Sequence, residues 1–159
     1  MRLIVSLLLL VSLQTTAQDL VLKNGHVRIM PPGQNNTAAF LVLKNTSKQD
    51  IRLMQVSTPA AKKAEFHTHL KDEKGMMRMR QMPHVDIKAN SEFEFKSGGH
   101  HIMLMGLTKP LSADSKVKFT LVSSDDKQVS IELPARSLLD EPKSGEPKHM
   151  DHSHHHMHH

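Results

Sequence analysis

Cysteine, tryptophan and tyrosine are absent from this sequence of 159 residues, and five phenylalanines supply the only aromatic rings besides those of histidine. A chain without cysteine forms no disulfide, performs no thiol–disulfide exchange and offers no thiolate to a metal ion. A blue-copper electron-transfer centre needs a Cys thiolate with two His, so that class of protein is excluded. For the same reason we expect no lipidated cysteine to tether the chain.

Clustered positive charge and stacking rings, the two marks of a nucleic-acid-binding protein, are scarce as well. The formal net charge is +5 with neutral His, but the basic residues are scattered along the sequence. With so few rings to stack on bases, we expect no nucleic-acid partner. A weakly basic surface is suited instead to docking with an acidic protein.

One long apolar run is present, at the N-terminus. Residues 3–13 are apolar apart from two serines, follow a charged start at Arg2 and precede a small-residue ending at Ala17. This pattern predicts a secretory signal peptide over residues 1–17, and the run is too short to span a membrane. We therefore expect a periplasmic protein of one domain, with no stable membrane insertion.

A period of two residues recurs between Leu20 and Leu133, interrupted by turn residues. The predicted strands are residues 21–22, 26–30, 38–44, 51–57, 64–69, 76–81, 92–96, 102–106, 116–122 and 128–133. No helical stripe exceeds two turns, and residues 59–63 are expected to form one turn at most. Many short strands separated by turns predict an all-β domain over residues 18–135, a Greek-key barrel or sandwich.

The alternating pattern stops at Pro134, and residues 140–148 are polar and contain two prolines and a glycine. We therefore expect a flexible linker over residues 136–148. Residues 149–159 predict a disordered, metal-binding tail. Its candidate ligands are His149, Met150, His152, His154, His155, His156, Met157, His158 and His159. A mobile imidazole-rich segment suits Cu(II), Zn²⁺ or Ni²⁺. A purification tag is the alternative origin, although its interruption by other residues is unlike a designed tag.

Histidine and methionine are also concentrated inside the domain. The donors there are His67, His69, Met76, Met77, Met79, Met82, His100, His101, Met103 and Met105. On a strand, His101 and Met103 point to one side while Ile102 faces the core. Neutral imidazoles and thioethers suit Cu(I) better than Zn²⁺, Mg²⁺ or Ca²⁺. The stretch therefore predicts one Cu(I) site built by neighbouring strands.

Each donor also has an ordinary structural explanation, since a single Met is more often a core filler than a ligand. We interpret several methionines as fillers or partly exposed side chains and several histidines as surface or hydrogen-bonded ones. These residues are Met54, Met76, Met82, Met105, His26, His84 and His100.

Several motifs resemble the PCuAC family of periplasmic copper chaperones, whose pattern is His–x10–Met–x21–His–x–Met on a cupredoxin-like barrel. They are Gly-Met-Met-Arg-Met-Arg at 75–80, His-Ile-Met-Leu-Met-Gly-Leu at 101–107, Pro-Pro-Gly at 31–33 and Ala-Ala-Phe at 38–40. The resemblance covers residues 25–133, essentially the whole domain.

This resemblance implies Met79, His101 and Met103 as Cu(I) ligands. Counting back from Met79 by the family's spacing reaches Thr68, which has a histidine on either side. One extra residue in the turn before Met79 would restore His67 as the first ligand, and His69 stays open as an alternate.

The resemblance further implies a monomeric carrier, not an enzyme. It would deliver Cu(I) to the CuA site of cytochrome c oxidase subunit II or to a Sco-type assembly factor. A passive periplasmic copper buffer shares every one of these residues and is the alternative. No Ser-His-Asp set or carboxylate pair with motif spacing indicates catalysis.

Overall fold

The computed structural model describes residues 19–139. The expected signal peptide, most of the expected linker and the whole His/Met-rich tail lie outside these residues. Ten strands are present: β1 (Leu20–Arg28), β2 (Asn36–Asn45), β3 (Ile51–Ser57), β4 (Ala61–Lys71), β5 (Met77–Gln81), β6 (Val85–Ile87), β7 (Glu92–Phe95), β8 (His101–Leu107), β9 (Lys116–Ser123) and β10 (Gln128–Arg136). No helix able to cross a bilayer is found between residues 19 and 139. The all-β class is confirmed.

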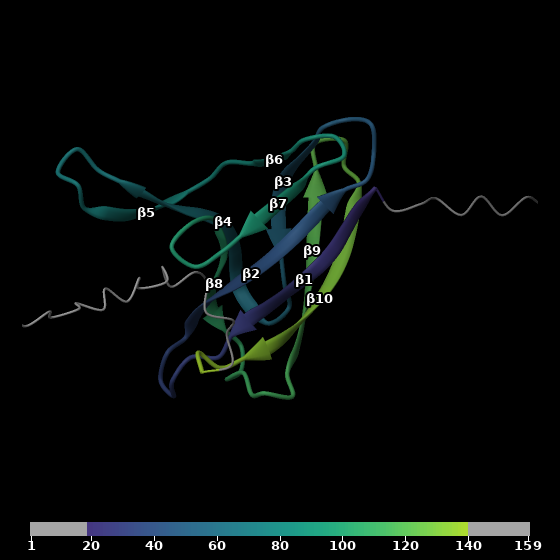
Figure 1. The fold of residues 1–159 in the computed structure, drawn as a ribbon. Coiled ribbons are helices and arrows are strands. Elements are labelled where there is room, and N and C mark those ends of the chain that lie inside the picture. Colours follow the sequence, from purple (N-terminus) through teal and green to yellow (C-terminus); the bar gives the residue numbers. More distant parts are fainter. Residues whose placement is uncertain (1–18, 140–159) are drawn as a thin grey trace, which may run out of the picture.

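The strands follow one another in the order β5-β4-β8-β2-β1-β10-β9-β3-β6, and β7 pairs with β2 beside β8 (Figure 1). A short parallel pairing of β1 with β10 joins the half that contains β2, β4 and β8 to the half that contains β3 and β9. Within residues 19–139 this path does not close, so β5 and β6 form its two edges. The β4–β5 hairpin extends away from the body of the molecule (Figure 1).

One hydrophobic core lies between the two halves. In β9 the alternating residues Val117, Phe119 and Leu121 are all buried, as the sequence pattern predicts. In β2 the residues Ala39 to Leu41 are buried without a break, because this strand is paired on both sides and covered on both faces. Each fully buried large side chain contributes about 1.5–3 kcal/mol. Packing of this kind stabilises the domain.

The strands predicted at residues 21–22 and 26–30 are one continuous strand, so the break expected between them, at Asn24-Gly25, is wrong. β1 runs straight through it, and the pairing with β2 shifts register between Leu22 and Asn24, where the chain bulges. Gly25 allows this close approach, since a Cβ there would lie 2.6 Å from Leu41 Cβ. The glycine signals tight packing, which a sequence pattern does not separate from a turn.

Two further expectations about the strands need correction. β6 was not predicted, because three residues are too few to show alternation. β10 continues beyond its expected end at residue 133 to Arg136, because Ala135 N–H donates to Ser115 O and Arg136 O accepts from Ile29 N–H. Residues 59–60 form a turn and Ala61 begins β4, which agrees with the expected single turn at most.

Candidate metal centre

Strand register gathers the predicted donors on one face of three adjacent strands. β4 lies between β5 and β8, and His67 is paired with His101, whereas His69 is paired with Met79. Cross-strand partners point to the same face, so these four side chains share one side of the sheet. Met103 follows His101 by two residues on the same face, opposite Glu65.

The other face of these strands packs into the core. Phe66 and Thr68 alternate with the histidines of β4 and are buried, as are Ile102 and Leu104 in β8. The expected orientation of β8, with Ile102 inward, is therefore confirmed. The core thus fixes the strands that present the donors.

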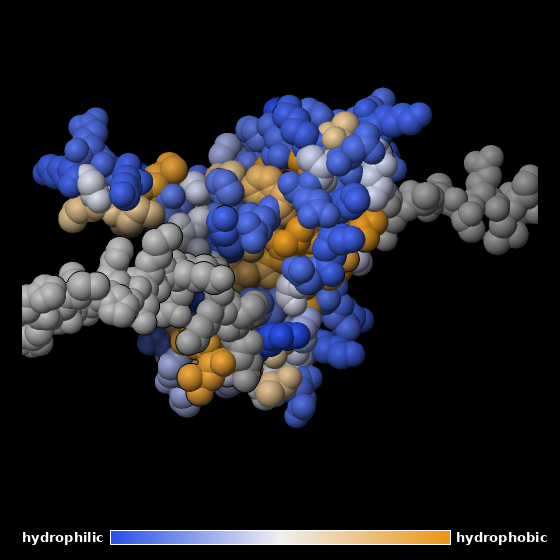
Figure 2. Space-filling model, in the orientation of Figure 1, coloured by the Kyte–Doolittle hydropathy of each residue, from blue (hydrophilic) through white to orange (hydrophobic). Residues whose placement is uncertain are grey.

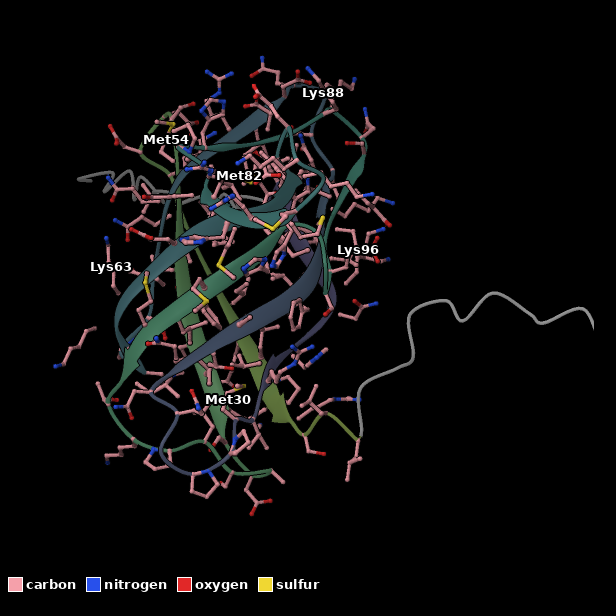
Figure 3. The ribbon with its side chains drawn as sticks, turned by 90° about the vertical axis from the view of Figure 1, so that its left-hand side faces the viewer. Met30, Met54, Lys63, Met82, Lys88 and Lys96 are labelled. Carbon is pink, nitrogen blue, oxygen red and sulfur yellow. The ribbon has the colours of Figure 1, made fainter. Side chains whose placement is uncertain are left out.

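Three imidazoles lie close together at the centre of this face. The ring centroid of His101 is 5.9 Å from that of His67 and 5.0 Å from that of His69. Phe40 covers the other side of His101 at 6.4 Å, and His101 is only 2% exposed. Figure 3 faces this side of the molecule and shows sulfur atoms in yellow near nitrogens in blue over the middle of the sheet.

The hydrogen bonds of the rings leave nitrogens for a metal ion. His67 Nε2 lies 2.9 Å from Glu65 Oε2, and His101 Nδ1 lies 3.1 Å from Gly99 O. Nδ1 of His67 and Nδ1 of His69 are buried and have no hydrogen-bond partner. A buried nitrogen without a partner carries a desolvation cost, which coordination to a metal would remove. The residues present therefore fit a bound copper ion.

Burial favours the neutral form of the His101 ring, which is the form that binds a metal ion. Desolvation lowers the pKa of His101, opposed by its hydrogen bond to Gly99 O and assisted by the neighbouring imidazoles of His69, His67 and His100. A lowered pKa favours the neutral ring, which is the form that binds a metal.

Met79 and Met103 differ in exposure and in their position relative to the imidazoles. Met103 is half-buried beside His101, whereas Met79 is 43% exposed on the projecting hairpin. Their register positions, opposite Glu65 and His69, are four residues apart along β4, about 13 Å on a flat strand. The hairpin must bend over the imidazoles for both sulfurs to contact one ion.

The residues interpreted as ordinary side chains each have exposure or contacts of their own. Met54 and Met76 are exposed, and Met82 packs partly against the core. The His100 ring lies against Phe93 at 5.2 Å. The remaining three are Met105, opposite Lys63, His84, 3.6 Å from an Asp86 oxygen, and His26, 5.5 Å from the Phe40 ring. Across residues 19–139, no three His, Asp or Glu side chains are arranged to hold a metal ion alone.

Sequence reasoning missed Glu65. Its side chain is only 11% exposed and lies between Lys63 Nζ, at 2.5 Å, and the His67 ring. The hydrogen bonds from His67 and Lys63 lower the pKa of Glu65, so it is a carboxylate. The alternation of residues 63, 65, 67 and 69 on one strand face was the signal available.

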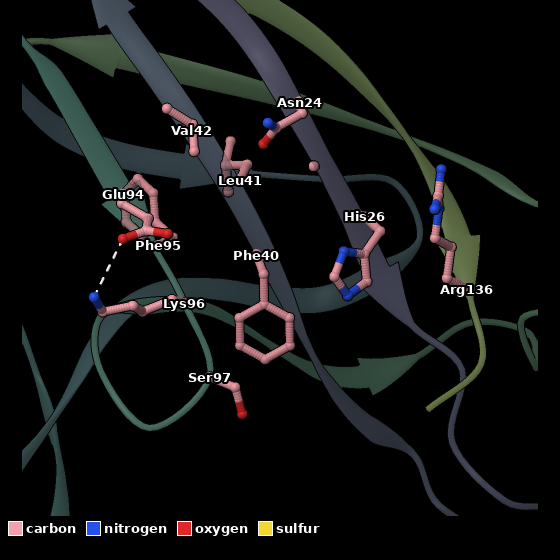
Figure 4. A pocket seen from close by; sticks show the side chains of 11 residues that line it. Asn24, His26, Phe40, Leu41, Val42, Glu94, Phe95, Lys96, Ser97 and Arg136 are labelled. Atoms are coloured by element: carbon pink, nitrogen blue, oxygen red, sulfur yellow. Dashed lines mark ion pairs between the residues drawn. The ribbon is translucent and has the colours of Figure 1, made fainter. Parts of the chain in front are cut away.

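A separate hollow of about 510 Å³ lies beside the centre. His26, Phe40 and Arg136 are among the residues that line it, with the Glu94–Lys96 ion pair at its rim (Figure 4). Phe40 separates this hollow from His101.

Together these observations describe an all-β domain that presents soft metal donors on one face of its sheet. The chain belongs to the LpqE-like family, since the family model described as "Putative lipoprotein LpqE-like" matches residues 20–135. A curated relative, "Putative lipoprotein Lxx21020" of Leifsonia xyli subsp. xyli, is 31% identical over 106 residues, or 67% of this chain. The match spans 64% of that relative's length.

Solved structures share the fold. The solution structure of CuI-DR1885 from Deinococcus radiodurans is 31% identical with a TM-score of 0.58, and the match covers 71% of this chain and 75% of that one. The copper-bound PCuAC domain from PmoF2 is 16% identical with a TM-score of 0.63, and the match covers 77% and 96%. The likeness to PCuAC domains and the cupredoxin-like fold are therefore confirmed.

Proposed function

We propose that this chain is an extracytoplasmic copper chaperone that holds Cu(I) with His67, Met79, His101 and Met103. The observation that carries the proposal is the gathering of these soft donors on one face of β5, β4 and β8. The CuI form of a relative that is 31% identical supports the same metal and oxidation state. His69 is an alternate ligand, because its ring lies even closer to His101 than that of His67.

The donor chemistry favours Cu(I). Two neutral imidazoles and two thioethers leave the bound ion with its single positive charge, and thioether sulfur prefers this soft cation. Glu65 is not free to act as a hard ligand, because Lys63 and His67 occupy its oxygens. Methionine sulfur also does not protonate, so acid competes only with the imidazole ligands.

The different exposure of the donors suits a carrier. His67, His101 and Met103 lie on strands that the core holds in place, while Met79 lies on the exposed hairpin. Closing of the hairpin adds the fourth ligand. An acceptor's ligand displaces Met79 first, because that sulfur is reached from solvent, and copper then leaves by stepwise ligand exchange.

For the acceptor we propose the CuA domain of cytochrome c oxidase subunit II or a Sco-type factor, bound transiently by a monomeric chain in the periplasm. The hairpin that carries Met79 also carries Arg78 and Arg80, both exposed, and much of the hairpin surface is hydrophilic (Figure 2). Such a basic surface would suit an acceptor with an acidic docking surface. We also propose that residues 149–159 collect Cu(II) and raise the copper concentration near the barrel.

A transfer assay tests the proposal. The Cu(I)-loaded chain is mixed with a metal-free CuA domain, the two are separated, and copper is counted on each. Stoichiometric transfer is expected from a chaperone. Retention of copper by this chain would instead establish the buffer, the second candidate, and failure of the chain to bind Cu(I) would defeat both.

A further inference from the structure

Two hydrogen bonds determine which nitrogen each histidine can offer to a metal. We infer that Glu65 is a positioning residue that holds the proton of His67 on Nε2 and so presents Nδ1 to Cu(I), whereas the Gly99 carbonyl holds the proton of His101 on Nδ1 and presents Nε2. This inference rests on the proposed function, since it names how two of the four ligands are oriented.

The Glu65 contact allows a single tautomer of neutral His67. Glu65 Oε2 lies 2.9 Å from His67 Nε2, and its other oxygen lies 2.5 Å from Lys63 Nζ. A carboxylate only accepts hydrogen bonds, so Nε2 must carry the proton and donate it. The lone pair is then on Nδ1, the buried nitrogen that has no other partner.

A backbone carbonyl has the opposite effect on His101. Gly99 O accepts from His101 Nδ1 at 3.1 Å and also from the His69 backbone N–H at 3.3 Å. A carbonyl oxygen likewise only accepts, so the His101 lone pair is on Nε2. Two neighbouring imidazoles thus have different nitrogens free to bind a metal ion.

Because the two histidines bind through different nitrogens, the ion would lie closer to the hairpin. Nδ1 is closer than Nε2 to a histidine's own backbone, so copper bound to Nδ1 of His67 and Nε2 of His101 lies nearer β4 than β8. β5, which carries Met79, is the other neighbour of β4. The choice of nitrogen therefore shortens the distance that Met79 must cross.

Glu65 can be tested by substitution. Glu65→Gln keeps an oxygen that accepts from Nε2–H, whereas Glu65→Leu removes it while filling similar space. Glu94, on β7, is a matched control, because it also pairs with a lysine two residues away, Lys96, whose Nζ lies 3.2 Å from its carboxylate. Among residues 19–139, Glu94 has no hydrogen bond or ion pair to a histidine.

The first readout is the tautomer in the metal-free full chain, from two-bond ¹⁵N–¹H correlation spectra of the rings. Signals of His67 and His101 are identified by their loss in His67→Ala and His101→Ala. We expect the proton on Nε2 of His67 and on Nδ1 of His101. In Glu65→Leu we expect a mixture of His67 tautomers, while Glu94→Leu leaves the spectrum unchanged.

The second readout is occupancy of the barrel site, followed through the ¹³C-methyl signals of Met79 and Met103 during Cu(I) titration against a competing chelator. Loss of an outer-shell hydrogen bond to a metal-binding His costs roughly 10–100-fold in affinity. We expect this loss in Glu65→Leu, a smaller one in Glu65→Gln and none in Glu94→Leu.

The outcomes separate this inference from the proposed function. A His67 ring protonated on Nδ1 in the unmodified chain overturns the inference, as does parent-like Cu(I) affinity in a folded Glu65→Leu variant. If that variant does not fold, the tautomers of the unmodified chain still decide. A chain with the expected tautomers that leaves the Met79 and Met103 signals unmoved by Cu(I) defeats the proposed function alone.

Discussion

At the scale of single residues, sulfur is what separates a copper ligand from an ordinary apolar side chain. Met79→Leu and Met103→Leu keep the volume and remove the sulfur, so the fold should survive. We expect Cu(I) affinity to fall by more than the roughly 10–100-fold that an outer-shell loss costs. Competition with a Cu(I) chelator measures the Cu(I) affinity of each variant.

Met54→Leu is the control for these two variants, because Met54 is 42% exposed and lies on β3, which pairs with β6 and β9 and not with a donor strand. Parent-like affinity in either Met79→Leu or Met103→Leu would show that the ligand set is wrong.

The first histidine ligand is decided by a comparison of His67→Ala with His69→Ala. Only His67 is held by Glu65, and it is paired directly with His101. We therefore expect the larger loss of Cu(I) affinity in His67→Ala. X-ray absorption of the Cu(I) form should show two nitrogen and two sulfur neighbours in His69→Ala. The reverse ranking would assign the ligand to His69.

At this scale the sequence predicted which side chains gather, but not how they are held. The two-residue alternation placed His101 with Met103 and His67 with His69, because side-chain direction on a strand follows sequence spacing. Glu65 was missed, since its partners depend on the pairing of strands. The distance that Met79 must cross was missed for the same reason.

At the scale of strands, Gly25 tests the bulge in β1. A Cβ there would lie 2.6 Å from Leu41 Cβ and 2.8 Å from Phe40 O, contacts that require the strands to move apart. We expect Gly25→Ala to lower the free energy of unfolding by roughly 1–3 kcal/mol or more. Urea titration measures this.

Gly99→Ala is the control for stability, because the nearest atom to a Cβ there is the flexible Lys96 Cγ at 3.4 Å. Equal stability of Gly25→Ala and the parent would contradict the close packing of β1 on β2.

The turn of the β4–β5 hairpin depends on Asp72. Its carboxylate accepts from Arg78 Nε at 2.6 Å and from the N–H groups of Met76 and Lys74, and these bonds lower its pKa below 3.8. A lowered carboxyl pKa stabilises the turn above about pH 3.8, and this stabilisation is lost as the pH falls through the folded-state pKa. The amide shift of Met76 should therefore titrate with a midpoint below 3.8.

Arg78→Ala removes the largest of these contributions, so the Met76 midpoint should rise towards 3.8. Lys74→Ala is the matched control, because the Lys74 contribution comes from its backbone N–H and survives the change. If the Met76 midpoint is the same in Arg78→Ala as in the parent, the ion pair between Arg78 and Asp72 is contradicted.

Most strands were predictable because one face of each is buried, as in β9. The exceptions have particular causes: β6 is only three residues long, Gly25 resembles a turn residue, and Pro134 resembles a strand end although its neighbours in β10 are paired. In each case tertiary packing, which the local sequence does not encode, decides whether these residues belong to a strand.

At the scale of the whole molecule, the contribution of the tail can be separated from that of the barrel. Ala135 is buried and Arg136 is paired with β1, so a truncation must lie after Arg136 to leave the fold intact, and one after Leu139 keeps every residue that the structure describes. We expect the truncated chain to keep its Cu(I) site but to take up Cu(II) less and to load more slowly from dilute copper. Unchanged uptake and delivery would defeat the role proposed for residues 149–159.

In the described part of the chain the sheet ends at β5, so one row of backbone N–H and C=O groups on that strand faces no other described strand. Such an edge invites strand addition by another chain, and flanking charge is a known protection against it. Arg78 and Arg80 give β5 that charge while its methionines stay open to water. The same two arginines would therefore keep copies of the chain from pairing edge to edge. Their removal should lower the solubility of the chain more than it lowers the Cu(I) affinity.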